Sequence, residues 1–183
     1  YEMYFLSTLN HPSILPLLAC VCGHDEVPES VLKEMKWTEK GKMKLPSHTA
    51  ANPTELKALL STAFCYVYPC MAFDLDLLVK MRANTKKQIN QAQIIKVREL
   101  KLIFFSLLTA LLYLEDSKGL CHLDIKPANL LVSLEGMVQL TDFSISRLNG
   151  SGQKSGLVAT HGYQPPEVIL GGQWSGRKVD IWS

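Results

Sequence analysis

The sequence is short of several residue types and patterns, and each shortage argues against a class of protein. Its 183 residues include 5 cysteines, an odd number, and no paired C-x-x-C motif. We therefore expect small buried thiols rather than disulfides or zinc ligands. No run of about 18 uninterrupted apolar residues occurs, so nothing predicts a membrane span. These features are typical of an intracellular protein of the cytoplasm, the nucleus or both.

Neither sign of charge is in excess. There are 19 Lys and Arg residues against 17 Asp and Glu residues, a net charge of +2. A protein whose main partner is nucleic acid or an anionic membrane usually concentrates positive charge on one face. The balance therefore predicts neither partner. A hydrophobic content of 47% instead fits a folded domain with a substantial core.

Hydrophobic periodicity predicts a fold of the α+β class. Apolar residues recur at helical spacing in residues 1–9, where Pro12 soon breaks the pattern, and in a wide stripe over 97–116. The second stripe predicts a strongly buried helix. Short runs of apolar, aromatic or β-branched residues predict strands. The predicted strands are residues 14–22, 63–71, 130–133 and 138–140, the last two joined by a turn at 134–136.

Two stretches have a different composition. Residues 23–62 are polar and contain at most two short helices, about 29–36 and 54–61, which is typical of an inserted surface loop. The insertion is either a docking loop for a partner or an artefact such as retained intron sequence, and its composition favours neither. Residues 145–166 are rich in Gly, Ser and Thr and predict a mobile loop.

Polar residues with a common chemistry gather after the long helix. Asp124, Lys126 and Asn129 lie in one turn between this helix and a strand, and Asp142 follows the next strand. Such a set suits phosphoryl transfer, in which a protein mainly positions groups and neutralises charge. Asp124 can accept a proton from an attacking hydroxyl, and Lys126 can offset charge on the phosphoryl group. Asp142 is a hard oxygen ligand for Mg²⁺, and the amide oxygen of Asn129 can hold a second ion.

These residues belong to motifs that resemble those of eukaryotic protein kinases. HLDIKPANLL at 122–131 resembles the HRDxKPxNLL catalytic loop, and TDFS at 141–144 resembles the metal-binding DFG segment. THGYQPPE at 160–167 is similar to the T-x-x-Y-x-A-P-E end of the activation segment, and DIWS at 180–183 to the start of the following core helix. The resemblance implies a two-lobed fold. Residues 1–71 would form a partial antiparallel-sheet N-lobe and hinge, and 72–183 a partial, mainly helical C-lobe.

The resemblance also implies ATP and Mg²⁺ as cofactors. Glu2 would end the regulatory helix and pair with the ATP-binding lysine. The implied nucleotide-binding positions are Tyr68 as gatekeeper, Cys70 and Met71 in the hinge, Asp74 near the ribose and Leu131 under the adenine. Thr160 would belong to the substrate-binding loop, and Ser155 would be the regulatory phosphorylation site.

Finer features resemble one branch of the family. Lys126 and Thr160 are typical of serine/threonine kinases. The residues after the hinge, the KPANLL sequence of the catalytic loop and the end of the activation segment resemble cyclin-dependent kinases, nearest to cell-cycle-related kinase. This resemblance implies a protein substrate, a cyclin-like activator and proline after the target residue. The branch's usual Arg before the A-P-E sequence is Gln164 here, which weakens the proline expectation.

Three further substitutions depart from the family pattern. Leu123 replaces the Arg that grips an activation-loop phosphate, so we expect activity to depend little on Ser155 phosphorylation. Ser144 replaces a glycine, whose backbone freedom a Cβ restricts. Pro165 replaces Ala and is expected to stiffen the loop.

Other positions have structural interpretations. We expect His122, Phe143 and Leu6 to be packing residues, and Asp180 to cap its helix and hydrogen-bond the catalytic loop.

The chain lacks a G-x-G-x-x-G loop and a V-A-I-K-type lysine. We expect it to begin after them and to stop before the partner of Glu167, so that it is inactive alone and exposes apolar surface. The alternative function is a pseudokinase that acts as a scaffold, which Leu123, Ser144 and Gln164 favour. A small-molecule kinase is a weaker third interpretation, because those folds rarely carry this activation segment.

Overall fold

The computed structural model describes residues 6–21, 65–89, 94–149 and 158–183. The chain divides into two compact units, one of residues 1–15 with 70–183 and one of residues 16–69. Short antiparallel strands and helices make up the described residues, which confirms the predicted α+β class. The predicted insertion at 23–62, with its two short helices, lies outside them.

The unit of residues 16–69 contains one antiparallel pair, β1 (Ala19–Val21) with β2 (Cys65–Val67). Both strands lie inside the predicted runs but are shorter. Pro16 separates β1 from Ile14, because proline has no N–H to donate to a ladder. Ile14 belongs to the larger unit, where it forms an isolated parallel bridge with Leu140.

A three-stranded antiparallel sheet positions the polar loops of the larger unit. Its order is β3 (Phe73–Asp74), β5 (Leu130–Val132) and β6 (Val138–Leu140). The predicted hairpin between β5 and β6 is confirmed, with the amide of Ser133 donating to the carbonyl of Met137 at 2.9 Å. Gly136 has φ +85° in the turn, a left-handed angle that glycine adopts at little cost.

Two helices, α4 (Leu75–Ile89) and α5 (Val97–Lys118), are joined by a shared acceptor. Glu99 Oε2 accepts a hydrogen bond from the Lys96 amide at the start of α5 and another from Arg82 of α4, each at 2.8 Å. The helix ends at Gly119, which has φ +58°, a common C-terminal cap. The prediction of a helix over 97–116 is confirmed, and residues 6–8 are also helical, within the predicted 1–9.

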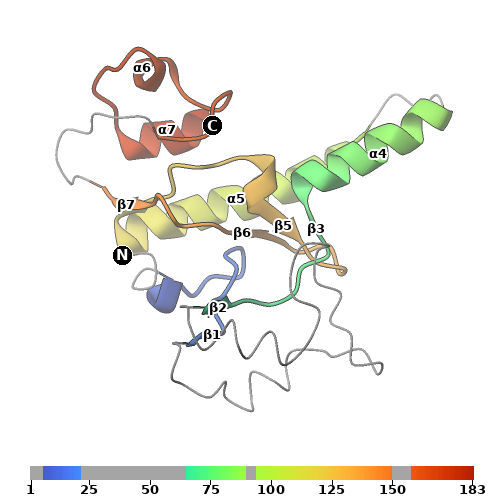
Figure 1. The fold of residues 1–183 in the computed structure, drawn as a ribbon, viewed down its shortest axis with the longest axis horizontal. Helices are drawn as coiled ribbons and strands as arrows, with labels where there is room; N and C mark the ends of the chain where they lie inside the picture. The colour runs from blue at the N-terminus through green and yellow to red at the C-terminus, as the bar shows by residue number, and fades with distance from the viewer. Residues whose placement is uncertain (1–5, 22–64, 90–93, 150–157) are drawn as a thin grey trace. The chain divides into compact units, whose positions relative to one another are not determined.

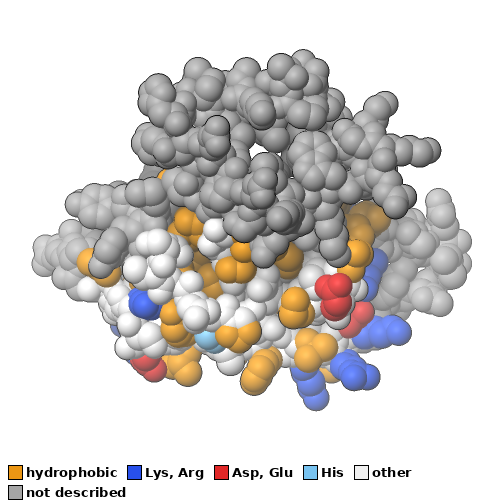
Figure 2. Space-filling model, turned by 90° about the horizontal axis from the view of Figure 1, so that it is seen from below, with side chains coloured by type: hydrophobic (Ala, Val, Ile, Leu, Met, Phe, Trp, Pro, Cys, Tyr) orange, Lys and Arg blue, Asp and Glu red, His pale blue; other side chains and the backbone are white. Residues whose placement is uncertain are grey.

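The predicted strong burial of the long helix is wrong for the part of the chain that the structure describes. Helix α5 packs against β6 (Figure 1), and there Ala110 and Leu114 are buried. Phe104, Leu108 and Leu112 are more than half exposed, because a helix on one sheet buries only one stripe of its surface. On the face drawn in Figure 2, hydrophobic side chains also reach the surface beside Lys and Arg side chains.

Smaller elements complete the larger unit. They are β4 (Leu120–Cys121) paired with β7 (Arg147–Leu148), the 3₁₀ turn η1 (Pro127–Asn129), α6 (Pro166–Ile169) and α7 (Gly176–Trp182). Strand β7 and the first residue of α6, Pro166, fall within the predicted loop 145–166, so that prediction is wrong at these three positions. The described helices do not combine the length and apolarity that a membrane span needs.

The start of α7 packs tightly against β4. A Cβ added at Gly176 would lie 2.6 Å from Sγ and 2.8 Å from Cβ of Cys121, whose side chain is buried. Only a residue without a side chain fits at this helix start.

We predict that Gly176→Ala destabilises the protein, although alanine favours helices by about 1 kcal/mol. The overlap with Cys121 should lower the free energy of unfolding by about 1–3 kcal/mol, measured by urea denaturation. Lys178→Ala, at an exposed position of α7, is the control and should change little. Equal or greater stability of Gly176→Ala would contradict the packing.

Candidate active site

The antiparallel hairpin brings the polar turns together. Leu130 of β5 pairs with Leu140 of β6, so Asn129 and Thr141 lie opposite each other at the same end of the sheet. The Thr141 amide donates to the Asn129 carbonyl at 3.0 Å, which extends this pairing by one residue. Asp142 follows directly. The fold therefore places the catalytic-loop motif and the metal-binding motif on adjacent turns.

The carboxylate of Asp124 is the centre of a network between two distant segments. Lys126 Nζ lies 2.6 Å from Asp124 Oδ2 and 2.7 Å from Thr160 Oγ1. Thr160 donates its amide and its hydroxyl to Asp124 Oδ1, at 3.0 and 2.6 Å. Asn129 Nδ2 donates to the carbonyl and to Oδ2 of Asp124, at 2.9 and 3.0 Å. The structure thus joins four of the predicted site residues.

These donors decide the charge of Asp124. Burial by itself raises the pKa of this carboxyl, but hydrogen bonds from Lys126 and Thr160, together with the charge of Lys126, outweigh it and lower the pKa below its ordinary value. Asp124 therefore stays ionised at neutral pH and can accept a hydrogen bond from a further hydroxyl. The stability that the network contributes is lost only as the pH falls through the lowered pKa.

Asn129 and Asp142 present oxygens suited to a hard cation. Because Asn129 uses its amide nitrogen toward Asp124, its amide oxygen is the atom left for coordination. Asp142 is exposed, and its Oδ1 accepts a hydrogen bond of 2.7 Å from the hydroxyl of Ser144. Among the described residues, no group of three His, Cys, Asp or Glu side chains could enclose a metal. The residues fit Mg²⁺, which typically binds one or two protein oxygens and keeps its other positions for water and phosphate.

Ser144 does not strain its backbone. Asp142 has the left-handed φ of +65°, whereas Ser144 is not among the non-glycine residues with positive φ. The serine side chain therefore costs no backbone strain here, and its hydroxyl makes a contact with Asp142 that glycine would lack.

Asp180 of α7 binds the backbone of the catalytic loop. Its carboxylate accepts the amides of His122 at 2.8 Å and Leu123 at 2.6 Å. Leu123 has φ +71°, which is costly for a residue with a branched side chain, and the short hydrogen bond to Asp180 stabilises it. The predicted contact between Asp180 and the loop is confirmed. The predicted helix cap is wrong, because Asp180 lies inside α7, for which Ser175 is the N-cap residue.

His122 is a fully buried structural residue, as predicted. Its Nδ1 accepts the Asp124 amide at 3.2 Å, so the proton resides on Nε2, which donates to the Thr141 carbonyl at 2.9 Å. The ring also meets Phe143 edge to face, with centroids 4.9 Å apart. His122 thereby links the catalytic loop to the segment that carries Asp142.

Gln164 has a role that the sequence did not reveal. Its Nε2 donates to the carbonyls of Val158 and Ala159, each at 3.1 Å. Ala159 has φ +63°, so the side-chain amide stabilises an unusual backbone conformation just before Thr160. The sequence suggested only the loss of an arginine, because a contact with main-chain carbonyls leaves no residue pattern to recognise.

The predicted nucleotide-binding residues are brought together only in part. Asp74 of β3 pairs in register with Leu131 of β5, so these two are neighbours. Asp74 Oδ1 also accepts the Leu77 amide at 2.7 Å and so caps α4, a function that sequence reasoning missed. Of the others, Tyr68 is half-buried after β2, Cys70 is exposed and Met71 is half-buried before β3, and Glu2 lies outside the described residues. Ser155, the predicted regulatory phosphorylation site, also lies outside them.

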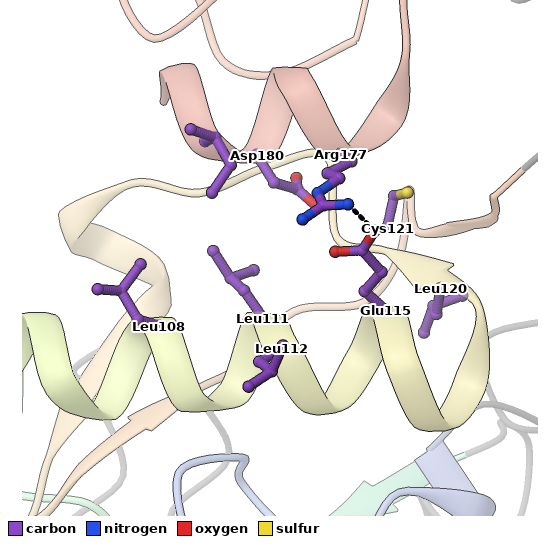
Figure 3. Close-up of a pocket in the computed structure, with 9 residues that line it drawn as sticks. Leu108, Leu111, Leu112, Glu115, Leu120, Cys121, Arg177 and Asp180 are labelled. Carbon is purple, nitrogen blue, oxygen red and sulfur yellow. Dashed lines mark ion pairs between the residues drawn. The ribbon is translucent and has the colours of Figure 1, made fainter.

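A hollow of about 240 Å³ lies between α5, β4 and α7. Figure 3 shows leucines of α5 on one side of the hollow. Glu115 of α5 forms an ion pair of 2.7 Å with Arg177 of α7. Asp180 lines the hollow as well as binding the catalytic loop. The four residues of the Asp124 network do not line it, so the hollow lies outside that network.

The burial of His122 predicts acid sensitivity. Burial lowers the pKa of His122 to about 4, although the Thr141 carbonyl and nearby carboxylates oppose this shift. As the pH falls below about 6.5, His122 is protonated in the unfolded chain but not in the folded protein. The free energy of unfolding therefore falls as the pH falls from there to about 4. We expect a loss of about 2 kcal/mol between pH 7 and pH 5, measured by urea denaturation.

His122→Asn should be less stable at neutral pH and should lose most of this pH dependence. Ser146→Ala is the matched control, because Ser146 Oγ donates to the His122 carbonyl but does not titrate. It should keep the wild-type slope. An unchanged slope in His122→Asn would assign the acid sensitivity to other groups.

Comparison with known proteins agrees with the geometry. The protein kinase domain family matches residues 32–183. Mitogen-activated protein kinase kinase 2 of Arabidopsis thaliana is 41% identical over 86 residues, which are 46% of this chain and 23% of that protein. CTD kinase subunit alpha of Saccharomyces cerevisiae is 31% identical over 139 residues, or 75% of this chain and 25% of that protein.

A Candida albicans serine/threonine-protein kinase is 29% identical over 194 aligned positions, which cover 99% of this chain and 22% of that protein. The chain thus spans about a quarter of the length of these relatives. Its family match, however, covers most of its own residues, including the turns that form the Asp124 network. The chain belongs to the protein kinase domain family, with serine/threonine kinases among its relatives.

Proposed function

We propose that this protein is a serine/threonine kinase that transfers the γ-phosphate of ATP to a hydroxyl of a protein substrate. The observation that carries the proposal is the joint contact of Lys126 with Asp124 Oδ2 and Thr160 Oγ1, at 2.6 and 2.7 Å. A partly buried ion pair next to a hydroxyl donor from a second segment contributes little to stability by itself, because desolvation offsets much of its attraction.

Each member of the network has a proposed chemical role. Asp124, kept ionised by its donors, orients the substrate hydroxyl and accepts its proton. Lys126 places its ammonium where charge on the transferred phosphoryl group is to be stabilised. Thr160 belongs to the substrate-binding loop and already occupies Asp124 Oδ1 with a hydroxyl, the same group that a substrate would offer.

Asn129 and Asp142 are the proposed protein ligands of Mg²⁺. The ion, bound with ATP, would neutralise phosphate charge during transfer. The protein contributes the orientation of these two oxygens: Asn129 through its bonds to Asp124, and Asp142 through its bond to Ser144.

The ATP site is proposed from the motifs. Tyr68, Cys70 and Met71 would line the adenine side with Leu131 below it, Asp74 would lie near the ribose, and Glu2 would pair with the ATP-binding lysine. We also propose that residues 1–71 and 72–183 correspond to parts of the two kinase lobes. The pairing of Asp74 with Leu131 supports the placement of these two residues in one site.

The finer assignment is to the cyclin-dependent-kinase-like branch, nearest to cell-cycle-related kinase, with a cyclin-like activator and an intracellular location. The similarity to CTD kinase subunit alpha over 75% of this chain supports the branch. Gln164 replaces the branch's arginine, but its hydrogen bonds to the carbonyls of Val158 and Ala159 support an ordered substrate-binding loop.

The competing function is a pseudokinase that serves as a scaffold. Leu123, Ser144 and Gln164 depart from the kinase pattern, and they are the observations in its favour. The intact network around Asp124 favours catalysis instead.

A peptide-phosphorylation assay on the full-length protein separates the two functions. Asp124→Asn should lower transfer to a degenerate Ser/Thr peptide library by about 10²–10⁴-fold, because it removes the proton acceptor. ATP binding should persist in this variant. Asp116→Asn, at an exposed position of α5, is the control and should retain activity. Wild-type protein that binds ATP–Mg²⁺ without transfer would favour the scaffold.

The bond between Ser144 and Asp142 predicts a change in metal affinity. A hydrogen bond that orients a ligating carboxylate commonly contributes about tenfold to affinity. Ser144→Ala should therefore weaken Mn²⁺ binding to the protein–nucleotide complex about tenfold, measured by electron paramagnetic resonance. Ser117→Ala, on the exposed part of α5, should not change it. Unchanged or tighter binding in Ser144→Ala would show that Asp142 is oriented without the hydroxyl.

A further inference from the structure

The side chain of Leu123 is fully buried in an apolar cluster. The cluster joins residues 121–123 to residues between 158 and 179, which are distant from them in sequence. Its buried members are Cys121, Leu123, Val158, Val168, Trp174 and Val179, and Ala159 packs against them. Leu123 therefore does not simply leave an arginine's place empty. It packs the catalytic loop against Val158 and Ala159.

The direction of the Leu123 side chain is fixed by its backbone. The left-handed φ of +71° and the 2.6 Å hydrogen bond to Asp180 define where its Cβ points. Since His122 and Leu123 donate to the two oxygens of the same carboxylate, rotation of this dipeptide would break both bonds. The apolar contact is thus preorganised by α7.

The same stretch of chain carries the polar contacts of the site. Asp124 follows Leu123 directly, and Thr160 follows Val158 and Ala159. Thr160 donates twice to Asp124, while Val158 is 5% exposed in the cluster with Leu123. Two neighbouring residues of the catalytic loop therefore hold two neighbouring parts of the substrate segment, one by apolar packing and one by hydrogen bonds.

We propose that Leu123 is a positioning residue that orders the substrate-binding segment at 158–160 by apolar packing, so that this order does not require a phosphate. The proposal rests on the kinase function proposed above. The cluster contains no charged side chain, and burial of apolar surface does not depend on a phosphoryl group. A guanidinium that grips a phosphate would instead gain its hold only after modification.

Hydrogen exchange of the full-length protein tests the proposal without catalysis. Leu123→Ala should raise exchange of the 158–163 amides at least about tenfold relative to the β5–β6 hairpin, because a core cavity loosens its neighbours. Leu123→Met should restore most of the protection, since methionine conserves volume. Leu114→Ala is the matched control: Leu114 is 1% exposed in α5 but outside the cluster, so its cavity should not act selectively on 158–163.

Phosphatase treatment and Ser155→Ala form the second arm. Neither should change exchange of the 158–163 amides by more than about twofold relative to untreated wild-type protein, because the packing is uncharged. In kinetic assays, Leu123→Ala should raise KM for the peptide about tenfold more than KM for ATP.

Two results would overturn the proposal: equal exchange in Leu123→Ala and the wild type, or deprotection of the wild-type segment by phosphatase. If the wild type transfers no phosphate but the expected exchange pattern appears, the positioning role of Leu123 is supported and only the kinase function fails.

Discussion

The carboxylate of Asp180 is the contact on which the polar site depends. It accepts two successive amides of the catalytic loop and thereby holds Leu123 in a left-handed conformation that this residue would not adopt alone. This conformation sends Leu123 into the apolar cluster and leaves Asp124 facing Lys126 and Thr160. Asp180 is itself 8% exposed, so water competes little for its oxygens.

Burial disfavours the charged form of both His122 and Asp124, yet the two residues have different charge states. Among the described residues, no charged group lies at hydrogen-bond distance from His122, so burial dominates and keeps it neutral at physiological pH. Asp124 is also largely buried, but an ammonium, a hydroxyl and an amide donate to it, so it stays charged. The loop therefore combines a neutral structural imidazole with an ionised carboxylate two residues further along the chain, and the donors rather than the burial distinguish them.

Much of the fold followed from local patterns. The α5 helix and the β5–β6 hairpin appear where periodicity and turn residues predicted them, because these elements are built from contacts near in sequence. Predictions failed where distant contacts decide. The exposure of Phe104 and Leu108 depends on what α5 packs against, and the pairing of β4 with β7 joins segments separated by the catalytic loop.

The sequence by itself determined the family and proposed Asp124, Lys126, Asn129 and Asp142 as the residues for its chemistry, because a motif records residue types that the chemistry requires. Only the tertiary structure decided what the departures do. Leu123 enters a core, Ser144 binds Asp142 and Gln164 supports Ala159, and each contact depends on a backbone direction. Those directions arise from long-range hydrogen bonds and packing, such as the bonds between α7 and the catalytic loop, which no local pattern encodes.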